Sequence, residues 1–431
     1  MRDTETVRPK LRIGYMVGGF PGLTETFIVR EIEGLRKRGF EVTVFASMRS
    51  GDPVERSLCS EEILRECVYA RPDSFGRHLV ANLKGLLAHP VRYLKTLGLY
   101  LRQAPSVEPA VFVRLLYHFF TGIGFAEDLR KRGIDHVHCH FAVACNIALA
   151  AHRFAGISYS FTVHASADIF MKAVMLEEKT AGARFVVAVC EYSRRFLDLV
   201  TGYRHSDKLF RIYNGVDADE SERLLGEPLR PRVSEAGSGG ELRIVSVGSL
   251  RPLKGHPTLV KAVALAREKG LAITCHIIGE GAERPVLERL VAEASLQESV
   301  ILTGPLSLRE VYELLRKADV FALLCEIGPS GYRDAFPTAI MEAMALELPV
   351  VSTWISGVPE MVDHERTGIL VPERHAESAA VAFERLCADP ELRRKMGAAG
   401  RERLRKHFDP EQSTEQLARL MRDAGTLSRT P

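Results

Sequence analysis

Hydrophobic residues alternate between two patterns along this chain. Short runs of β-branched and other apolar residues are separated by longer stretches in which apolar residues return every three or four positions. The first pattern predicts buried strands and the second predicts amphipathic helices. Alternation of the two from end to end is typical of parallel sheets covered by helices. The sequence therefore predicts an α/β protein with two such sheets.

The expected elements fall into two sets. Strands of the first half are expected at Leu11–Val17, Glu41–Phe45, His136–His140, Ser160–His164, Phe185–Val189 and Leu209–Tyr213. Strands of the second half are expected at Arg243–Val247, Ala272–Ile278, Val300–Thr303, Val320–Leu324, Pro349–Ser352 and Gly368–Val371. Helices are expected at Thr26–Arg38, Thr258–Lys269, Arg284–Ala294, Leu308–Lys317, Ala339–Leu346 and Ala376–Ala388.

A break in the pattern divides the chain into domains. Residues 221–240 hold Pro228, Pro231 and a glycine-serine run, and no periodic pattern crosses them. We interpret this stretch as an interdomain linker between an N-terminal domain of residues 1–220 and a C-terminal domain of residues 241–408. The charged helical segment in residues 409–431 fits either domain on its pattern alone.

Composition narrows the class of protein. The 431 residues are 46% apolar and 26% charged, which excludes a disordered chain or a fibre and allows two or three domains. A net charge of +3 argues against a dedicated nucleic-acid-binding protein. The N-terminus is polar and no run of about 18 uncharged apolar residues occurs, so we expect a cytoplasmic protein. The eight scattered cysteines read as reduced core thiols.

An insert at about residues 75–130 departs from the βα alternation. It carries basic residues among Leu, Tyr and Phe, with few acidic ones before Glu127. One interpretation is a peripheral contact with the inner face of a membrane of anionic lipid. The other is a pair of helices that packs on the N-terminal sheet, and we favour this one. The basic residues in question are Arg77, Lys84, Arg92, Lys95, Arg102 and Arg114.

The segment Asp334-Ala-Phe-Pro-Thr-Ala-Ile-Met-Glu342 is the first candidate site. Pro337 fits the first turn of a helix, where its missing N–H is no loss, and the amides of residues 335–339 are then available to an anion. Two carboxylates with seven residues between them flank this helix start. The layout suits a ligand with hydroxyls at both ends and phosphates between, such as a nucleotide sugar. The alternative is a plain helix with two solvated carboxylates.

The segment Gly248-Ser-Leu-Arg-Pro-Leu-Lys254-Gly255 is the second candidate. It directly follows an expected strand, so it lies at the edge where open α/β sheets bind ligands. Its glycines allow a close approach of the backbone, and Lys254 offers a positive charge to a diphosphate. The alternative is a tight turn with an exposed lysine.

The N-terminal half contributes weaker signals. Gly18 and Gly19 follow the first expected strand but lack the spacing of a dinucleotide-binding loop, so we expect a loop that lines the interdomain cleft. Three histidines between 136 and 140 alternate and so share one side of a strand. They indicate a strand end facing a cleft rather than a metal site. His164 and Asp168 follow another strand, with a structural role for His164 left open.

Together these motifs resemble family 4 of the retaining glycosyltransferases, which have the GT-B architecture. The likeness runs from about Leu11 to Phe408, and its N-terminal part is most similar to bacterial exopolysaccharide enzymes of the colanic acid and amylovoran type. It rests on Phe20-Pro with Thr24-Glu-Thr-Phe-Ile, His140-Phe141, Thr162-Val-His164, Tyr213-Asn-Gly-Val-Asp217, Gly248 with Lys254-Gly255, Ile278-Gly-Glu-Gly281, Asp334 to Glu342, Ser356-Gly-Val-Pro-Glu360 and Gly368-Ile-Leu-Val-Pro372.

The resemblance implies a fold and an activity. The fold is GT-B, with two doubly wound Rossmann-like domains facing across a cleft and a last helix, 409–431, that crosses back to the N-terminal domain. The activity is metal-independent, retaining transfer of a hexose-type sugar from a UDP-sugar or GDP-sugar to a glycan, lipid-linked or small-molecule acceptor, without a bound cofactor. The alternatives are an epimerase on the same plan and a nucleotide-sugar-binding protein whose active site has decayed.

The resemblance also assigns site residues. His164, Asp334 and Lys254 would be catalytic, with His164 facing the reacting sugar, Asp334 meeting the donor sugar and Lys254 neutralising the diphosphate. Glu342 would hold the ribose. Ser249 stands where the family usually has arginine, which leaves open whether Arg251 compensates, and Asp334 and Ala335 replace the usual glutamate and glycine. The expected donor-binding residues are Gly19, Ser249, Arg251, Lys254, Glu280, Gly281, Ala335, Phe336, Pro337, Thr338 and Glu342.

Overall fold

The computed structural model describes residues 10–22, 26–50, 59–71, 75–164, 174–229, 240–329 and 331–428. The chain forms two compact units. Unit 1 comprises Met1–Val189, Ser193–Ile212 and Glu411–Pro431, and unit 2 comprises Cys190–Tyr192 and Tyr213–Pro410. Thr24 and Glu25 of the opening motif, Asp168, and residues 230–239 of the expected linker lie outside the described residues.

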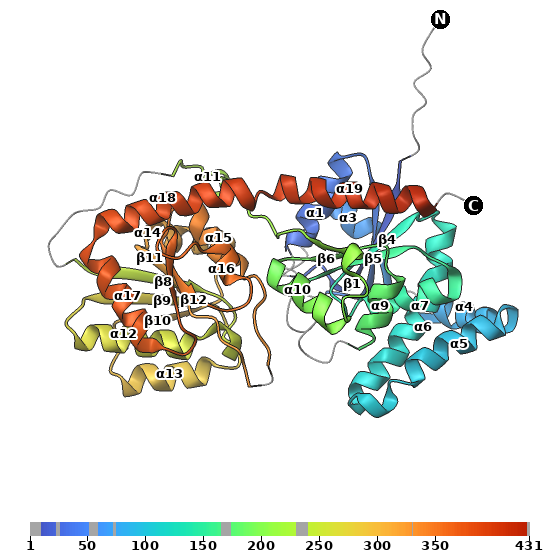
Figure 1. Ribbon diagram of the computed structural model, residues 1–431, viewed down its shortest axis with the longest axis horizontal. Helices are drawn as coiled ribbons and strands as arrows, with labels where there is room; N and C mark the ends of the chain where they lie inside the picture. Colours follow the sequence, from blue (N-terminus) through green and yellow to red (C-terminus); the bar gives the residue numbers. More distant parts are fainter. Residues whose placement is uncertain are drawn as a thin grey trace, which may run out of the picture. The chain divides into compact units, whose positions relative to one another are not determined.

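Unit 1 is built on a sheet of seven parallel strands (Figure 1). The strand order is β3-β2-β1-β4-β5-β6-β7, so the chain builds outward from β1 in one direction and then from β4 in the other. The strands are β1 (Arg12–Phe20), β2 (Glu41–Arg49), β3 (Val68–Arg71), β4 (His136–His140), β5 (Tyr159–Val163), β6 (Val186–Ala188) and β7 (Leu209–Arg211).

Helices cover both faces of this sheet. One buried apolar cluster joins α1 and α19 to one face, and another joins α6 and α7 to the opposite face. The helices are α1 (Thr26–Lys37), α3 (Glu61–Glu66), α4 (Phe75–Ala88), α5 (Pro90–Leu101), η1 (Ala104–Ser106), α6 (Pro109–Lys131), α7 (Cys145–Ala155), α9 (Leu176–Gly182), α10 (Glu191–Val200), η2 (Ser206–Lys208) and α19 (Pro410–Ser428).

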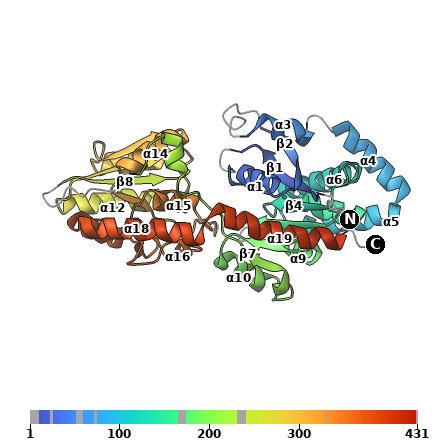
Figure 2. The ribbon, with the colours of Figure 1, turned by 90° about the horizontal axis from the view of Figure 1, so that it is seen from above.

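Unit 2 repeats the plan with six parallel strands (Figure 2). Its order, β10-β9-β8-β11-β12-β13, again reverses direction once, between β8 and β11. This is the strand order of a dinucleotide-binding Rossmann sheet. The strands are β8 (Leu242–Val247), β9 (Ile273–Ile278), β10 (Val300–Gly304), β11 (Val320–Leu323), β12 (Val350–Thr353) and β13 (Gly368–Val371).

The helices of unit 2 pack on this sheet, and one large apolar cluster joins β8 and β9 to α12 and α17. They are α11 (Glu220–Leu225), η3 (Pro252–Lys254), α12 (His256–Glu268), α13 (Arg284–Glu293), α14 (Leu308–Lys317), α15 (Thr338–Ala345), α16 (Val358–Met361), α17 (Ala376–Ala388) and α18 (Pro390–His407). The prediction of two parallel-sheet, Rossmann-like units is confirmed.

Several predicted details differ from the structure. Strand β3 was not predicted, because only three of its four residues are buried and the run is too short to show a pattern. Pro337 precedes α15 rather than occupying its first turn, since the helix begins at Thr338. Residues 221–225 were expected to be linker, but they form most of α11, whose Glu220 carboxylate accepts a hydrogen bond from the Tyr312 hydroxyl of α14, 2.9 Å away.

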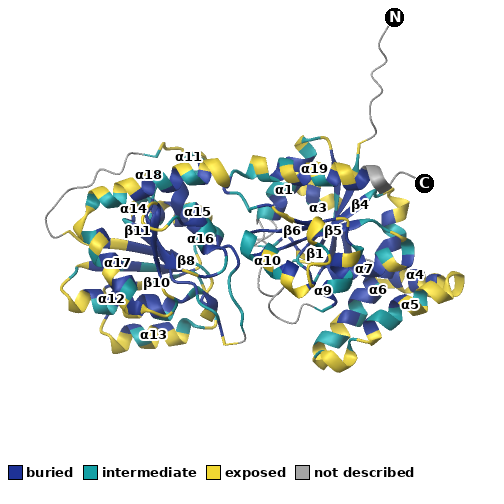
Figure 3. Cartoon of the chain, viewed as in Figure 1, coloured by how far each residue is buried: buried dark blue, intermediate teal, exposed yellow. Residues whose placement is uncertain are grey.

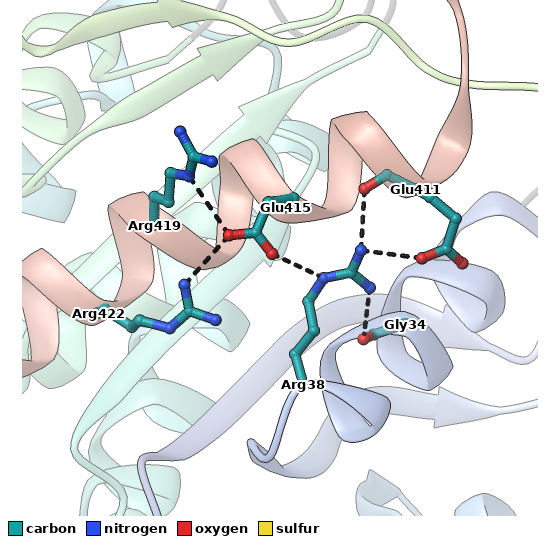
Figure 4. Close-up of polar contacts among 6 residues, drawn as sticks. All are labelled: Gly34, Arg38, Glu411, Glu415, Arg419 and Arg422. Atoms are coloured by element: carbon teal, nitrogen blue, oxygen red, sulfur yellow. Dashed lines mark hydrogen bonds and ion pairs between the residues drawn. The ribbon is translucent and has the colours of Figure 1, made fainter. Parts of the chain in front are cut away.

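The last helix, α19, belongs to unit 1 although the chain before it belongs to unit 2. Its apolar side chains Leu417, Ala418 and Met421 are buried in the same cluster as those of α1. Figure 4 shows the polar part of this contact, in which the Arg38 guanidinium reaches Glu411 at 2.8 Å and Glu415 at 3.0 Å. Apolar burial and an ion-pair network therefore hold α19 on unit 1.

Among the described residues, one helix is long and apolar enough to cross a membrane. This helix is α6, and half of its most apolar stretch is buried in unit 1. It packs against α7 and α4 as a core helix does. Length and composition alone are weak evidence for a membrane span, since buried core helices share both.

Candidate functional site

Each sheet has one switch point, where the strand order reverses and the loops on either side diverge. In unit 1 it lies between β1 and β4, and in unit 2 between β8 and β11. Open α/β sheets bind ligands at the carboxyl ends of the strands at such points. The residues that follow these four strands are therefore the candidates for function, and they are described for each unit separately.

Lys254 and Asp334 form a charged pair at the switch point of unit 2. Lys254 ends η3, just after β8, and Asp334 lies in the loop after β11. The Lys254 Nζ lies 2.6 Å from Asp334 Oδ2, and the side chains are only 14% and 17% exposed. Burial lowers the pKa of Lys254, but the attraction of the Asp334 carboxylate outweighs it and the pKa is raised. The ammonium group thus remains charged while largely removed from water.

Closely packed glycines shape the loops around this pair. A Cβ atom on Gly255 would lie 1.7 Å from the Leu324 carbonyl oxygen, and its φ of +65° also disfavours other residues. A Cβ on Gly281 would lie 2.4 Å from the Leu250 oxygen. The Leu250 amide donates to the Glu280 carbonyl at 2.9 Å, so the loops after β8 and β9 run side by side. Only glycine permits this spacing of backbone around the lysine.

The start of α15 lies in the same loop region as Asp334. The first-turn amides of a helix have no partner within the helix and carry a partial positive charge. Ala335 is fully buried, and Phe336 stacks on Tyr213 with ring centroids 5.3 Å apart. Thr338 is the first helical residue, and Glu342 lies one turn further on and is partly exposed. This arrangement fixes the helix start rigidly next to the Lys254–Asp334 pair.

Three of the predicted donor-binding residues of unit 2 are exposed, namely Ser249, Arg251 and Glu280. Ser249 carries no charge, so it cannot replace the family's arginine. The guanidinium of Arg251 lies over the ring of Tyr332 at 4.7 Å from its centroid. Glu280 pairs with Arg284 at 2.8 Å, and the hydrogen bond from Arg284 lowers the pKa of Glu280. In this structure Arg251 is engaged with Tyr332.

A row of histidines lies at the switch point of unit 1. His136, His138 and His140 of β4 are all fully buried, on the one side of the strand that their alternation predicts. The hydroxyl of Ser160 on β5 lies 2.7 Å from both His136 Nε2 and His138 Nδ1. His138 Nε2 contacts Thr162 Oγ1 at 2.9 Å. The strand end is therefore a hydrogen-bonded ladder of imidazoles and hydroxyls between two parallel strands.

The ladder ends in a chain that reaches His164. The Glu31 carboxylate of α1 accepts hydrogen bonds from the Tyr15 hydroxyl and from His140 Nε2, the latter at 3.0 Å. His140 Nδ1 lies 2.8 Å from His164 Nε2. Because a carboxylate only accepts, the proton of a neutral His140 sits on Nε2, and His164 must donate from its Nε2. This arrangement leaves the Nδ1 of His164 as the nitrogen with a lone pair.

Burial lowers the pKa values of His136, His138 and His164 and keeps these three imidazoles neutral. It lowers the pKa of His136 to about 3, and with the neighbouring His140 it holds the pKa of His164 well below the usual value. Phe27 and Phe141 contact the His164 ring at centroid distances of 4.6 and 4.9 Å. These three histidines of unit 1 are thus uncharged, unlike the Lys254–Asp334 pair of unit 2.

Glu31, His138 and His140 also meet the distance requirement for a metal site, with ligand atoms within 4.8 Å of one another. Hydrogen bonds already involve every ring nitrogen of the row from His136 to His140. A metal ion would have to displace the contacts of Thr162 and of Glu31. The donor set is therefore better described as a hydrogen-bond chain.

The sequence identified most of these residues but not their partners. Lys254 and Asp334 were predicted from separate motifs, and the structure brings them together. Glu31 was not predicted, because it lies on α1 and contacts His140, a strand residue more than a hundred positions away. No local sequence pattern indicates such a contact. Gly19 lies exposed at the end of β1, with no atom within 4 Å of a Cβ placed on it.

Two family models together cover most of the chain. Residues 24–220 match the model described as Glycosyltransferase Family 4, and residues 232–403 match the one described as Glycosyl transferases group 1. The boundary between the two matches falls in the region of 221–231, close to the predicted linker. The first model thus covers most of unit 1 and the second most of unit 2.

Relatives of known sequence agree with these models. A protein named as a colanic acid biosynthesis glycosyltransferase, WcaL of Escherichia coli, is 35% identical over 186 residues, 42% of this chain and 45% of that protein. The amylovoran biosynthesis glycosyltransferase AmsK of Erwinia amylovora is 32% identical over 180 residues, 42% of this chain and 44% of that protein. The matched stretch spans less than half the length of either relative.

A solved structure supports the fold along nearly the whole chain. HepE of Anabaena, in complex with UDP, superposes with a TM-score of 0.67 at 16% identity, covering 96% of this chain and all of that one. At this identity the likeness speaks for the fold alone. With both family models matched and the two parallel-sheet units in place, the chain belongs to glycosyltransferase family 4 and has the GT-B architecture.

Proposed function

We propose that this protein transfers a hexose-type sugar from a UDP-sugar or GDP-sugar to an acceptor hydroxyl, with retention of configuration at the sugar. The observation that carries the proposal is the buried Lys254–Asp334 pair at the switch point of unit 2. A protonated lysine beside a helix start is suited to a diphosphate, and a carboxylate beside it is suited to sugar hydroxyls.

The donor would change the partner of Lys254. Without donor, the ammonium group is neutralised by Asp334 at 2.6 Å. A diphosphate carries more negative charge than one carboxylate, so we expect it to replace Asp334 as the counter-ion of Lys254. Asp334 is then available to accept hydrogen bonds from the donor sugar, and Glu342 on α15 to accept them from the ribose. Family resemblance supports these two roles.

The other expected contacts with the donor follow from placing its diphosphate beside Lys254. The amides of Ala335, Phe336 and Thr338 would face the phosphates, while Pro337, which has no N–H, would hold the backbone in place. The backbone of Gly281 and the side chain of Glu280 would lie near the base. Ser249 would contribute a hydroxyl at most.

His164 of unit 1 is proposed to face the reacting sugar. Its Nδ1 keeps a lone pair because Glu31 and His140 fix the tautomer of the chain. Burial keeps the ring neutral, so it can accept a hydrogen bond from a sugar hydroxyl without carrying charge. Glu31 and His140 are positioning residues in this scheme. Gly19 is proposed to offer its backbone to the phosphates.

The reaction breaks the bond between the anomeric carbon and the phosphate oxygen. It forms a bond from the same carbon to the acceptor oxygen on the same face, and the acceptor proton passes to the departing diphosphate. Lys254 and the amides of α15 stabilise the negative charge that develops on the leaving group. No covalent nucleophile is required, and the proposal assigns leaving-group charge to these groups rather than to a metal ion.

The names of the relatives guide the choice of acceptor. WcaL and AmsK are named for the biosynthesis of colanic acid and amylovoran, both exopolysaccharides. We propose that the acceptor is a growing glycan, carried by a lipid at the inner face of the membrane. The protein would then act in the cytoplasm, where nucleotide sugars are made.

Thermal unfolding with UDP, GDP and their sugars tests the proposal. A ligand present at 100 times its Kd adds about 2.7 kcal/mol to the stability of the folded state. We expect one nucleotide family to raise the melting temperature, and Lys254→Ala to abolish the rise. Lys261→Ala, an exposed lysine on α12, is the matched control and should retain it. No shift with any nucleotide would refute the donor assignment.

A further inference from the structure

The hairpin of α4 and α5 exposes an unusual amount of apolar surface. Among the residues that the structure describes, nine of the twenty strongly exposed large apolar side chains lie within residues 75–101. Figure 3 shows the corresponding exposed stretches of α4 and α5 at the edge of unit 1. Single exposed apolar residues are ordinary, but a concentration on one element marks an interaction surface. The nine, here called the hairpin surface, are Phe75, Leu79, Val80, Leu83, Leu86, Leu87, Val91, Leu94 and Leu101.

Helix α4 presents this surface on a face of its own. Its buried residues, His78, Ala81, Asn82 and Gly85, form the face that packs on the rest of unit 1. Leu79, Leu83 and Leu87 repeat every four residues on another face, with Leu87 82% exposed. An apolar face without a protein partner costs free energy in water, so a second surface is expected to cover it.

Helix α5 continues the pattern after the turn at His89. Val91, Leu94 and Leu101 are exposed at helical spacing, while Thr96 and Tyr100 are buried on the other side. Leu86 and Leu87 at the end of α4 therefore precede Val91 and Leu94 by only four to eight residues. The apolar side chains are most concentrated where the two helices meet.

Every Asp, Glu, Lys or Arg position of the hairpin itself is a lysine or an arginine. Residues 75–107 contain Arg77, Lys84, Arg92, Lys95 and Arg102 and not one Asp or Glu. Arg77 lies 3.5 Å from Asp128 of α6. In the described part of the chain, the other four side chains form no ion pair and are exposed.

We infer that the hairpin surface docks on a bilayer that contains anionic phospholipid. Apolar side chains next to lysines and arginines are the pattern of a helix that lies in the plane of a membrane. Lysine and arginine can extend their charged ends to phosphate groups while their stems stay with the apolar side chains. A second copy of this chain would bring its own basic residues against these ones, which opposes self-association through the same surface.

Docking of this kind needs neither donor nor acceptor, so it stands apart from the proposed activity. It places unit 1 on the lipid through α4 and α5, while α6 stays in the core behind them. From the sequence, we favoured two helices packed on the sheet over a contact with a membrane, and the structure supports this packing for only part of their surface. One face of α4 packs on unit 1, and another carries the exposed leucines.

Vesicle sedimentation with the purified full chain tests the inference. We expect the protein to pellet with vesicles rich in phosphatidylglycerol, to stay in solution with phosphatidylcholine vesicles, and to be released by high salt. Leu83→Ser/Leu87→Ser should weaken binding by at least roughly tenfold. Lys84→Gln/Lys95→Gln should weaken it by about fivefold for each charge removed. Leu199→Ser, a leucine of α10 that is 62% exposed, is the matched control and should bind as wild type does.

Three results would overturn the inference. The first is wild-type protein that stays in solution with every vesicle composition. The second is pelleting that the leucine and lysine variants leave unchanged, although thermal unfolding shows all of them folded. The third is a concentration-dependent dimer, seen by light scattering without vesicle binding and lost in the leucine variant, which would identify a second copy as the occupant. A chain that binds vesicles but no nucleotide would contradict the proposed function and leave the docking surface intact.

Discussion

The two units use their switch points in opposite ways. Unit 2 holds a charged pair, Lys254 and Asp334, within loops where glycines lie against neighbouring carbonyl oxygens. Unit 1 holds buried imidazoles joined to hydroxyls and to one carboxylate. The same fold therefore offers a positive charge to an anion at one sheet and uncharged hydrogen-bond donors and acceptors at the other. The proposed donor combines both kinds of chemistry, since it carries a charged diphosphate and an uncharged sugar.

The largest effect is expected from removing the charge in unit 2. Lys254→Ala should lower turnover by ~100- to 1000-fold, because it removes the group proposed to stabilise the leaving diphosphate. Glu342→Ala should lower turnover by a similar factor, because it removes the proposed contact with the ribose. Initial rates on the purified, folded variants measure both. Near-normal turnover of Lys254→Ala would contradict the division between charged and neutral sites.

The glycines of the two units should differ in their effect on stability. In Gly255→Ala the alanine would have to adopt a left-handed backbone, and its Cβ would lie 1.7 Å from the Leu324 oxygen. We therefore expect a loss of about 3 kcal/mol or more in the free energy of unfolding. Gly19→Ala in unit 1 meets no atom within 4 Å and should change stability by less than about 0.5 kcal/mol. Scanning calorimetry measures both. Equal losses would show that the loops of unit 2 are no more tightly packed than the end of β1.

Lowering the pH should reduce the stability of unit 1 more than that of unit 2. Burial lowers the pKa of His136 to about 3 and that of His118 to about 4, and it holds the pKa values of His138 and His164 well below their usual value. In an unfolded chain a histidine titrates near ~6.5. Between these values the unfolded chain binds more protons, so stability falls as pH falls, by about 2 kcal/mol per histidine between pH 6.5 and 5. In the described part of unit 2, only His256 is comparably buried.

Urea unfolding at pH 7 and pH 5 follows the two units separately. Trp354, the chain's single tryptophan, reports on unit 2 by its fluorescence, and circular dichroism reports on both units. The two transitions should separate at pH 5, with the fluorescence change occurring at higher urea. If the fluorescence transition at pH 5 occurred at lower urea than the circular dichroism transition, unit 2 would be the acid-sensitive unit.

The smallest effect is expected where α19 meets unit 1. Arg38→Ala removes the ion pairs with Glu411 and Glu415, but Glu411 is 64% exposed and the helix is also held by Leu417 and Met421 (Figure 4). We expect a loss of about 1 kcal/mol in the free energy of unfolding. Leu417→Ala should cost more, about 2 to 4 kcal/mol. If Arg38→Ala cost more than Leu417→Ala, charge rather than apolar burial would hold α19 in place.

Local patterns predicted much of the site because each motif follows its own strand. The alternation of His136, His138 and His140 places three rings on one side of β4, since side chains of a strand alternate between faces. The position of Lys254 after β8 places it at a ligand-binding edge. Exposure of the leucines on α4 was not predicted, because a helix pattern alone does not show which of two apolar faces is covered.

The sequence by itself determined most of the elements, their alternation, the two parallel sheets and the identity of the groups at the strand ends. Only the tertiary structure decided which groups meet. Lys254 lies 2.6 Å from Asp334, 80 residues away, and His140 lies 3.0 Å from Glu31, because the strand order places β8 beside β11 and β1 beside β4. Strand order depends on hydrogen bonds and apolar contacts between distant segments, and no local pattern of residues encodes these.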